Sequence, residues 1–202
     1  MMKTVLYTQR VEIVESYGET RDCTDRRIPC FINECGYLPV PLPCITDIAI
    51  TMVKQLFPVG IVLTGGNSLA KYGGDAPERD EMEKKLMDIA VNDRIPVYGF
   101  CRGMQVILDY FGCKLTNVGG HIAIRHKISG NTSIEEVNSF HSQGCMEVTD
   151  SLEMLAYAED GVIESVRHKE YPVFATMWHP EREMVFREQD IKQVQQLFGS
   201  YK

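Results

Sequence analysis

The sequence predicts a single α/β domain with a mostly parallel central sheet flanked by helices and additional, partly antiparallel strands in its second half. Its 202 residues are 44% hydrophobic, which suits one globular domain with a sizeable core. In the first half, short apolar runs bounded by glycine alternate with amphipathic stretches, as in parallel strands covered by helices on both faces. In the second half, short strand-like runs follow one another. No repeat or long linker divides residues 1–202, so we expect one domain over this range.

The first half is expected to contain three buried strands, one extended segment and four helices. The strands are 3–8, 59–66 and 95–100, and the extended, proline-broken segment is 37–43. The helices are 21–36, 45–57, 77–93 and 102–112. Pro29 either kinks the first helix or marks its first turn, and Gly36 is a plausible C-cap. Residues 9–20 form a polar stretch.

The second half is expected to contain six short strand-like pieces and one closing helix. The pieces are 121–128, 133–140, 145–150, 153–160, 161–169 and 171–179, and the helix is 183–199. Some of these strands should be antiparallel, because no helical crossover separates them.

Composition narrows the function classes. The net charge of −7 does not predict a basic surface for nucleic acid or an anionic membrane. No apolar run approaches the roughly 20 residues of a membrane span, and the N-terminus lacks the apolar core of a signal peptide. Seven cysteines without CxxC spacing argue against a disulfide framework or a structural zinc site. We therefore expect a cytoplasmic protein with reduced thiols.

Cys101 is the candidate nucleophile. It lies in "GFCRG" between a predicted strand and a predicted helix, flanked by Gly99 and Gly103. A nucleophile on such a turn is exposed above the sheet, and glycine tolerates close packing and strained dihedral angles. The helix that begins at Arg102 directs its free N–H groups and positive dipole end toward Cys101. This arrangement favours a thiolate and can stabilise an oxyanion.

A thiol nucleophile needs a base, and the base works best when a third group orients it. "FATMWHPERE" offers His179 after a predicted strand and Glu181 two residues later. Positions i and i+2 of an extended chain face the same side, and Pro180 stiffens the link. We expect Glu181 to hold one imidazole nitrogen while the other faces the thiol.

These residues resemble the class I (triad) glutamine amidotransferase family. The family's Cys-His-Glu triad maps onto Cys101, His179 and Glu181 through "GFCRGMQ" and "WHPERE". The segments "PERDEMEKKL", "IPVYGFCRGMQVI", "VNSFHSQG" and "EDGVIESV" are more similar to its gamma-glutamyl hydrolase (peptidase C26-like) branch than to synthetase-linked glutaminases. The resemblance implies this family's flavodoxin-like α/β fold.

The resemblance also implies acyl transfer without a metal or organic cofactor. The Cys101 thiolate attacks the carbonyl of a gamma-glutamyl amide, and water then hydrolyses the thioester to release glutamate. The oxyanion would be met by the backbone N–H of Arg102 and by a second donor that maps onto Gly66 in "TGGN". His179 would protonate the leaving nitrogen and later activate the water.

Further residues are placed by the same resemblance. Gln105 and the segment containing Ser139, Phe140 and His141 are expected to bind the glutamyl amino and carboxylate groups, partly through backbone groups. Three other charged residues are expected to form structural ion pairs and caps: Arg79, Asp80 and Glu83. His121, His126 and His168 have no compelling partner in the sequence, and His121 and His126, near apolar alternation, are expected to be structural.

The long connection after the first strand is a candidate for recognition of the leaving group. It should emerge at the edge of the sheet where Cys101 lies, and ligands bind at this edge in parallel α/β sheets. Arg21, together with Arg10 or Tyr17, would contact an anionic leaving group, because arginine can bind a phosphate bidentately. The alternative is a solvated loop followed by the polar face of a helix.

Three functions follow from these observations. The first is a stand-alone cysteine-dependent hydrolase of a gamma-glutamyl amide. Known substrates in the branch that the chain resembles are gamma-glutamyl polyamine derivatives, polyglutamyl folate and gamma-glutamyl nucleotide amidates of bacterial capsule pathways, and this short chain with a charged N-terminal segment suits the last of these. The second is a glutaminase subunit that supplies ammonia to a separate partner synthetase. The third is a catalytically dead binding or regulatory protein on the same scaffold, which the intact triad disfavours.

Overall fold

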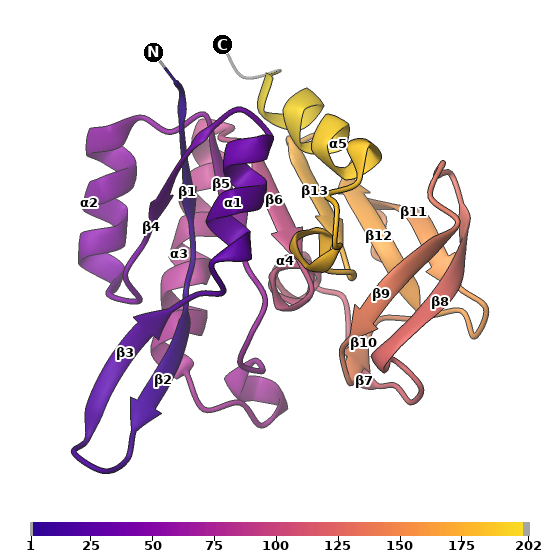
Figure 1. The fold of residues 1–202 in the computed structure, drawn as a ribbon, viewed down its shortest axis with the longest axis horizontal. Coiled ribbons are helices and arrows are strands. Elements are labelled where there is room, and N and C mark those ends of the chain that lie inside the picture. The colour runs from indigo at the N-terminus through magenta and orange to yellow at the C-terminus, as the bar shows by residue number, and fades with distance from the viewer. Residues whose placement is uncertain (1, 200–202) are drawn as a thin grey trace.

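A nine-stranded mixed sheet forms the centre of the molecule. The computed structural model describes residues 2–199. The strands of this sheet are β1 (Thr4–Tyr7), β4 (Leu38–Pro41), β5 (Gly60–Leu63), β6 (Val97–Phe100), β8 (Ile122–Gly130), β9 (Glu136–Phe140), β11 (Leu152–Ala158), β12 (Ile163–His168) and β13 (Val173–Thr176). Their spatial order is β4-β1-β5-β6-β13-β12-β11-β8-β9 (Figure 1). Neighbours from β4 to β13 are parallel, and neighbours from β13 to β9 are antiparallel.

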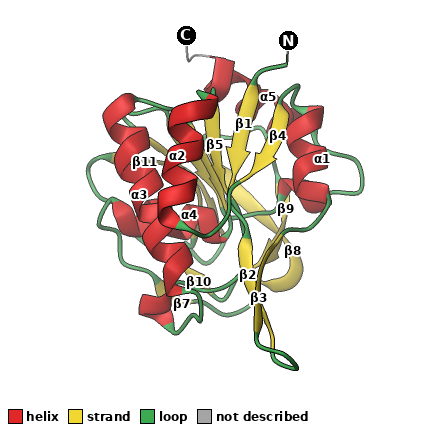
Figure 2. Cartoon of the chain, turned by 90° about the vertical axis from the view of Figure 1, so that its left-hand side faces the viewer, coloured by secondary structure: helices red, strands yellow, loops and turns green. Residues whose placement is uncertain are grey.

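Helices cover both faces of the parallel part of the sheet. They are α1 (Arg27–Glu34), α2 (Thr46–Leu56), α3 (Pro77–Asp93), α4 (Arg102–Tyr110) and α5 (Glu188–Gly199), with short 3₁₀ helices at Ala70–Tyr72 (η1) and Pro180–Arg182 (η2). α1 and α5 pack on one face, whereas α2, α3 and α4 pack on the other (Figure 2). No helix in residues 2–199 is long and apolar enough to cross a bilayer.

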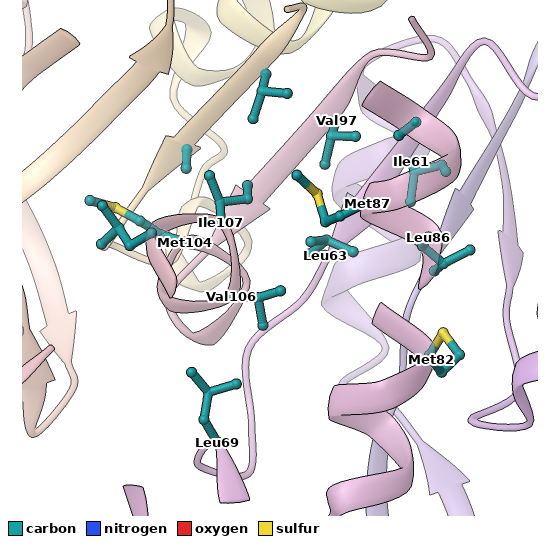
Figure 3. Packing of buried hydrophobic residues seen from close by; sticks show 14 of the residues in the cluster. Ile61, Leu63, Leu69, Met82, Leu86, Met87, Val97, Met104, Val106 and Ile107 are labelled. Carbon is teal, nitrogen blue, oxygen red and sulfur yellow. The ribbon is translucent and has the colours of Figure 1, made fainter. Parts of the chain in front are cut away.

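The strands are buried on both sides, which explains their unbroken apolar runs. In β5, Ile61 and Leu63 belong to the core under α2, α3 and α4, whereas Val62 between them belongs to the core under α1 and α5. Successive side chains of a strand point to opposite faces, so one short strand supplies both cores. Figure 3 shows the larger core, where Met87 of α3 and Ile107 of α4 lie against the sheet.

The predicted fold class is confirmed, and one local prediction near the N-terminus is wrong. The polar stretch and the first residues of the helix predicted at 21–36 form a hairpin of β2 (Arg10–Val14) and β3 (Glu19–Cys23) that projects below the sheet in Figure 1. Gly18, with φ +66°, lies in its turn. Most of its side chains are exposed, so its composition is polar and resembles that of a loop. The helix begins only at Arg27, and Pro29 lies in its first turn, where no N–H donor is needed.

Two predictions in the second half also differ from the structure. Residues 145–150 form no strand, whereas two short strands, β7 (Thr116–Asn117) and β10 (Gln143–Gly144), pair with each other nearby. The closing helix begins at Glu188 and not at residue 183. The Glu183 carboxylate accepts hydrogen bonds from Asn138 and Arg187, at 2.9 and 3.0 Å, and these contacts hold the preceding segment outside the helix.

Asp190 in α5 gives the fold a pH dependence that can be measured. Its carboxylate is buried and accepts a 3.0 Å hydrogen bond from Trp178 Nε1, but burial dominates and raises its pKa to about 6. The folded state therefore prefers protonated Asp190, and its stability falls as the pH rises from about 4, the ordinary carboxyl pKa, to about 6. We expect Asp190→Asn to raise the free energy of unfolding by up to about 3 kcal/mol at pH 7.5 and to change it little at pH 4. Urea unfolding at both pH values measures this difference, and a gain of equal size at both would contradict it.

Candidate active site

Cys101 lies on a strained turn between β6 and α4. Its dihedral angles are φ 51° and ψ −113°, a conformation that costs a non-glycine residue about 1–3 kcal/mol. The surrounding hydrogen bonds hold it there: Cys101 N donates to Thr176 O of β13 at 2.9 Å, and Gln105 N donates to Cys101 O at 3.1 Å. The thiol is thereby fixed at the carboxyl edge of two neighbouring parallel strands.

The two flanking glycines are explained by close packing. A Cβ at Gly103 would lie 1.9 Å from Leu63 O of β5, and a Cβ at Gly99 would lie 2.7 Å from Gly103 O. Real Cβ atoms do not approach a carbonyl oxygen so closely. The glycines thus let the first turn of α4 rest directly on the sheet, which places the N-terminal end of the helix at Cys101.

His179 and Glu181 are paired as the sequence suggested, but by a different local structure. His179 Nδ1 lies 2.7 Å from Glu181 Oε1, and both side chains are almost fully buried. Because Pro180 begins the 3₁₀ helix η2, the pair is set by a tight turn and not by an extended chain. Asn138 of β9 fixes the histidine backbone by accepting from His179 N and donating to His179 O, each at 2.9 Å. No pattern in the sequence indicated this role for Asn138.

The ring of His179 and the thiol of Cys101 lie on the same side of Gly65. A Cβ built on Gly65 would lie 2.9 Å from His179 Cε1 and 3.6 Å from Cys101 Cβ. Since a carboxylate only accepts hydrogen bonds, Nδ1 carries the proton shared with Glu181, and Nε2 is left for the thiol.

The titration behaviour of the two groups is coupled. Burial raises the pKa of the Cys101 thiol, but the charge and hydrogen bond of His179 outweigh burial, so the pKa is lowered overall. Burial lowers the pKa of His179, but the charges of Cys101 and Glu181 together raise it to about 10. These opposite shifts favour a thiolate–imidazolium pair near neutral pH, which is the reactive form of a cysteine nucleophile.

Gly66 and Arg102, the predicted oxyanion donors, lie on two different segments beside the thiol. Arg102 is the first residue of α4, so the helix does not use its N–H, and this group lowers the pKa of Cys101 by hydrogen bonding to the sulfur. Gly66 has φ +85° in the loop that follows β5. Both residues line a cavity of about 250 Å³ together with Cys101 and His179. Backbone N–H groups in these positions can stabilise an oxyanion that forms next to the sulfur.

A buried ion-pair network joins the loop that contains Gly66 to the first turn of α4. For its residues the sequence predicts only structural ion pairs and caps. Arg79 is fully buried, pairs with Glu83 at 3.0 Å and donates to the backbone oxygens of Thr64, Gly65 and Gly66 at 2.8, 3.1 and 2.6 Å. The side chain of Arg102 pairs with both Glu83 and Asp80. Glu83 thus links the arginine that holds the Gly66 loop to the first residue of α4.

The predicted glutamyl-binding residues are brought together around the same cavity, with one exception. Gln105, Phe140 and His141 line it, and the Phe140 ring lies edge-on to His179 at 5.6 Å. The side chain of Ser139 is turned away, because its hydroxyl donates to His121 O at 2.8 Å and is fully buried. His141 Nδ1 lies 3.1 Å from Gln143 O and its Nε2 faces Glu164, so ligand contacts there would come from its backbone.

A second cavity of about 320 Å³ adjoins the first, and Gly66 and His179 line both. Arg10, Glu12 and Thr24 contribute to it from the hairpin and the segment that follows. Arg21 lines neither cavity, and its guanidinium bonds to Glu19 and Tyr17 at 2.7 Å each. Arg10 is also paired on the hairpin, with Glu12, but it does line the second cavity. The hairpin therefore does reach the site, but with Arg10 and not with Arg21.

Three comparisons agree with this architecture. The sequence profile of the family "Glutamine amidotransferase class-I" matches residues 33–196. A gamma-glutamyl-CDP-amidate hydrolase of Campylobacter jejuni is 32% identical over 179 residues, which cover 87% of this chain and 88% of that protein. A gamma-glutamyl-gamma-aminobutyrate hydrolase of Escherichia coli O157:H7 is 29% identical over 191 residues, covering 74% and 75% of the two chains.

The fold is also found among crystal structures. A structure described as that of a GMP synthase subunit from Thermoplasma acidophilum superposes with a TM-score of 0.76 at 21% identity, covering 100% of this chain and 96% of that chain. This similarity concerns the fold. Together with the profile match over most of the sequence, it leads to one assignment: the chain belongs to the class-I glutamine amidotransferase family.

Proposed function

We propose that the protein is a cysteine-dependent hydrolase that cleaves a gamma-glutamyl amide to glutamate and a free amine or amidate. The observation that carries the proposal is a thiol on a strained turn whose pKa is lowered by a buried histidine, itself held by a carboxylate. Relatives named as gamma-glutamyl hydrolases support it. All seven cysteines are free, which suits the reducing cytoplasm, where we place the enzyme.

In the proposed mechanism, Cys101 Sγ attacks the side-chain carbonyl of the gamma-glutamyl group and forms a tetrahedral intermediate. The backbone N–H groups of Gly66 and Arg102 stabilise its oxyanion. His179 gives its Nε2 proton to the leaving nitrogen, and the carbon–nitrogen bond breaks to leave a thioester on Cys101. His179 then takes a proton from water, which attacks the thioester, releases glutamate and restores the thiolate–imidazolium pair.

The two other functions make different predictions. A glutaminase subunit would turn over free glutamine strongly only when its synthetase is added. We also test this alternative, because the fold resembles that of the structure described as a GMP synthase subunit from Thermoplasma acidophilum. A dead scaffold would release no glutamate at all. The lowered pKa of the Cys101 thiol disfavours this last function, because a structural thiol needs no activation.

A product screen tests the proposal. The chain is incubated alone with glutamine and with gamma-glutamyl derivatives of a nucleotide amidate, a polyamine, gamma-aminobutyrate and glutamate, and kcat/KM for glutamate release is compared. We expect turnover of at least one conjugate to exceed that of glutamine without any partner. Release from none of them would overturn the hydrolase proposal. Strong preference for the nucleotide amidate would match the activity in the name of the Campylobacter jejuni relative and would support the capsule-pathway role that the family resemblance suggests.

Arg10 is our candidate for contacting an anionic leaving group in the second cavity. A Cβ on Gly66 would lie 2.8 Å from Arg10 Cδ, so the arginine passes directly over the proposed oxyanion loop. A charge-assisted hydrogen bond contributes about 1.5–3 kcal/mol, so Arg10→Ala should lower kcat/KM for the nucleotide amidate by about 10- to 150-fold. Hydrolysis of a small neutral gamma-glutamyl anilide should change less than about threefold. Arg21→Ala on the same hairpin is the matched control and should leave both rates unchanged. Equal losses on both substrates for Arg10→Ala would contradict selective recognition.

Glu181→Gln should be milder than His179→Ala. Glutamine can still accept the Nδ1 hydrogen bond, but it removes the negative charge that helps raise the pKa of His179. We expect kcat to fall about 10- to 100-fold for Glu181→Gln and at least about 1000-fold for His179→Ala, which removes both base and acid. Steady-state rates on the best substrate decide this, and the reverse order would mean that the assigned roles are wrong.

A further inference from the structure

Three histidines surround one buried carboxylate away from the reacting thiol. His121 Nδ1, His126 Nε2 and His141 Nε2 lie 3.4, 3.5 and 3.3 Å from the same oxygen, Glu164 Oε1. Glu164 belongs to β12, His121 directly precedes β8, His126 lies within β8, and His141 directly follows β9. The sequence predicts structural roles for His121 and His126, and no pattern in it indicates this cluster.

The ligand atoms of three of these residues form a compact set. Among the described residues, His121, His141 and Glu164 each offer an atom within 4.8 Å of the other two, and all three side chains are at most 3% exposed. Neither Glu164 oxygen nor His141 Nε2 has a hydrogen-bond partner of ordinary geometry. A buried carboxylate without partners is costly, so this arrangement calls for a cation.

The protons of the two histidines can be placed from their outer contacts. His141 Nδ1 lies 3.1 Å from the carbonyl oxygen of Gln143, which can only accept, so Nδ1 bears the proton. His121 Nε2 lies 2.9 Å from the carboxylate of Asp160 and bears the proton for the same reason. In the neutral tautomers, His141 Nε2 and His121 Nδ1 therefore both present lone pairs to Glu164.

Ser139 does not relieve this arrangement. Its hydroxyl is 3.4 Å from His121 Nδ1, but its single proton is donated to His121 O at 2.8 Å. In these tautomers His121 Nδ1, His141 Nε2 and Glu164 Oε1 all present lone pairs to the space between them, and His126 Nε2, 3.5 Å from the same carboxylate oxygen, faces it from the fourth side. One cation bound by His121, His141 and Glu164 would satisfy all three groups at once, and the two rings lie with their centroids 4.7 Å apart.

We propose that His121, His141 and Glu164 bind a divalent transition-metal ion of the zinc type. Two imidazole nitrogens and one carboxylate oxygen are a recurrent zinc ligand set. With metal–ligand bonds of about 2.0–2.1 Å, tetrahedral geometry places ligand atoms about 3.3–3.4 Å apart. The observed 3.3 and 3.4 Å from Glu164 Oε1 to the two nitrogens match this spacing.

The outer contacts are those of metal-binding histidines. A ligating histidine usually donates its other ring N–H to a carboxylate or a backbone carbonyl, which fixes its tautomer. Asp160 does this for His121 and Gln143 O does it for His141. The Asp160 carboxylate also adds negative charge next to a site whose ligands carry only one.

The ion would brace the wall of the active site and take no part in the reaction. It would tie the start of β8, the end of β9 and β12 together at residues next to Phe140, whose ring packs on His179. Gln143 O accepts from both His141 and Gln105, so the same brace reaches the cavity beside Cys101. The proposal therefore does not depend on the hydrolase mechanism.

Metal content and thermal stability test the proposal. The chain is produced without a polyhistidine tag and with Cys101→Ser, because the reactive thiol and His179 could themselves bind zinc. After dialysis against metal-free buffer it is analysed by elemental mass spectrometry, and the metal-stripped protein is titrated with Zn²⁺. We expect about one equivalent of tightly bound zinc per chain and a lower thermal midpoint after chelation.

The zinc content of variants at the proposed ligands and at their neighbours tests where the ion binds. Glu164→Gln and His141→Gln should lose the equivalent of zinc and the response to chelator. His126→Gln is the neighbouring control. His126 faces the same oxygen of Glu164 but lies outside the compact set, so the His126→Gln chain should retain its zinc. Asp160→Asn should weaken zinc affinity about 10- to 100-fold.

Two results would overturn the metal site. One is a folded Cys101→Ser chain that neither retains nor binds zinc and whose thermal midpoint is the same with and without chelator. The cluster would then be a network of imidazoles and a carboxylate that binds no metal. The other is full zinc content in folded Glu164→Gln, which would place the ion elsewhere. If the Glu164 variant does not fold, chelation and zinc titration of the Cys101→Ser chain decide the question alone.

Discussion

Cys101→Ser is expected to abolish glutamate release while leaving the fold intact. Serine fits the strained turn, but its hydroxyl is far less acidic than a thiol, so the pair with His179 cannot hold it as an anion. Loss of the nucleophile in comparable sites lowers kcat by about 10⁴- to 10⁶-fold, and we expect a loss of at least about 10⁴-fold. Glutamate release on the best substrate measures the rate, and the thermal midpoint checks the fold.

An exposed cysteine provides the matched control. Cys30 on α1 is exposed, and Cys30→Ser should keep full activity. A glutamine-derived chloroketone should add one mass increment to the wild-type chain and to Cys30→Ser, but none to Cys101→Ser. Retained turnover by a clean preparation of Cys101→Ser would remove the thiol from the mechanism and leave the proposed function without its nucleophile.

Much of the parallel half of the fold was predictable, because its strands are buried on both faces. Continuous apolar runs such as 59–66, followed by glycine and an amphipathic stretch, leave few alternatives to a parallel strand and a covering helix. The hairpin at Arg10–Cys23 was missed for the opposite reason. Val11 is its only buried side chain, and β3, with the sequence ETRDC, has no alternating apolar residues, so the short alternation in β2 had no partner that would indicate a hairpin.

The site was predictable where a motif fixes local chemistry and unpredictable where distant segments meet. A glycine-flanked cysteine and a histidine two residues before a glutamate are visible in the sequence. The contacts of Asn138 with the His179 backbone span 41 residues and depend on the pairing of strands in the antiparallel half. The convergence of three histidines on Glu164 likewise follows from the order of β8, β9 and β12, which no local pattern encodes.

Arg79→Met should strongly destabilise the chain. Methionine leaves the fully buried Glu83 with Arg102 as its remaining arginine and removes the donor to three backbone oxygens of the Gly66 loop. Breaking a buried ion pair by removing one partner costs about 3–5 kcal/mol, and we expect a decrease of this size in the free energy of unfolding. Under conditions where the variant is folded, kcat should also fall about 100- to 1000-fold, the usual effect of losing one oxyanion donor.

Two further variants separate the loop contacts from charge alone. Lys71→Met removes an exposed ion pair with Asp109, so it should change the free energy of unfolding by less than about 1 kcal/mol. Arg79→Lys keeps the positive charge but lacks the planar fork that reaches Glu83 and several carbonyls at once, so it should recover only part of the stability and little of kcat. Urea unfolding and steady-state rates on the same preparations provide both readouts. If Arg79→Lys restored kcat completely, positive charge near the loop would be sufficient, and the hydrogen bonds to Thr64, Gly65 and Gly66 would not be what positions the proposed oxyanion donor.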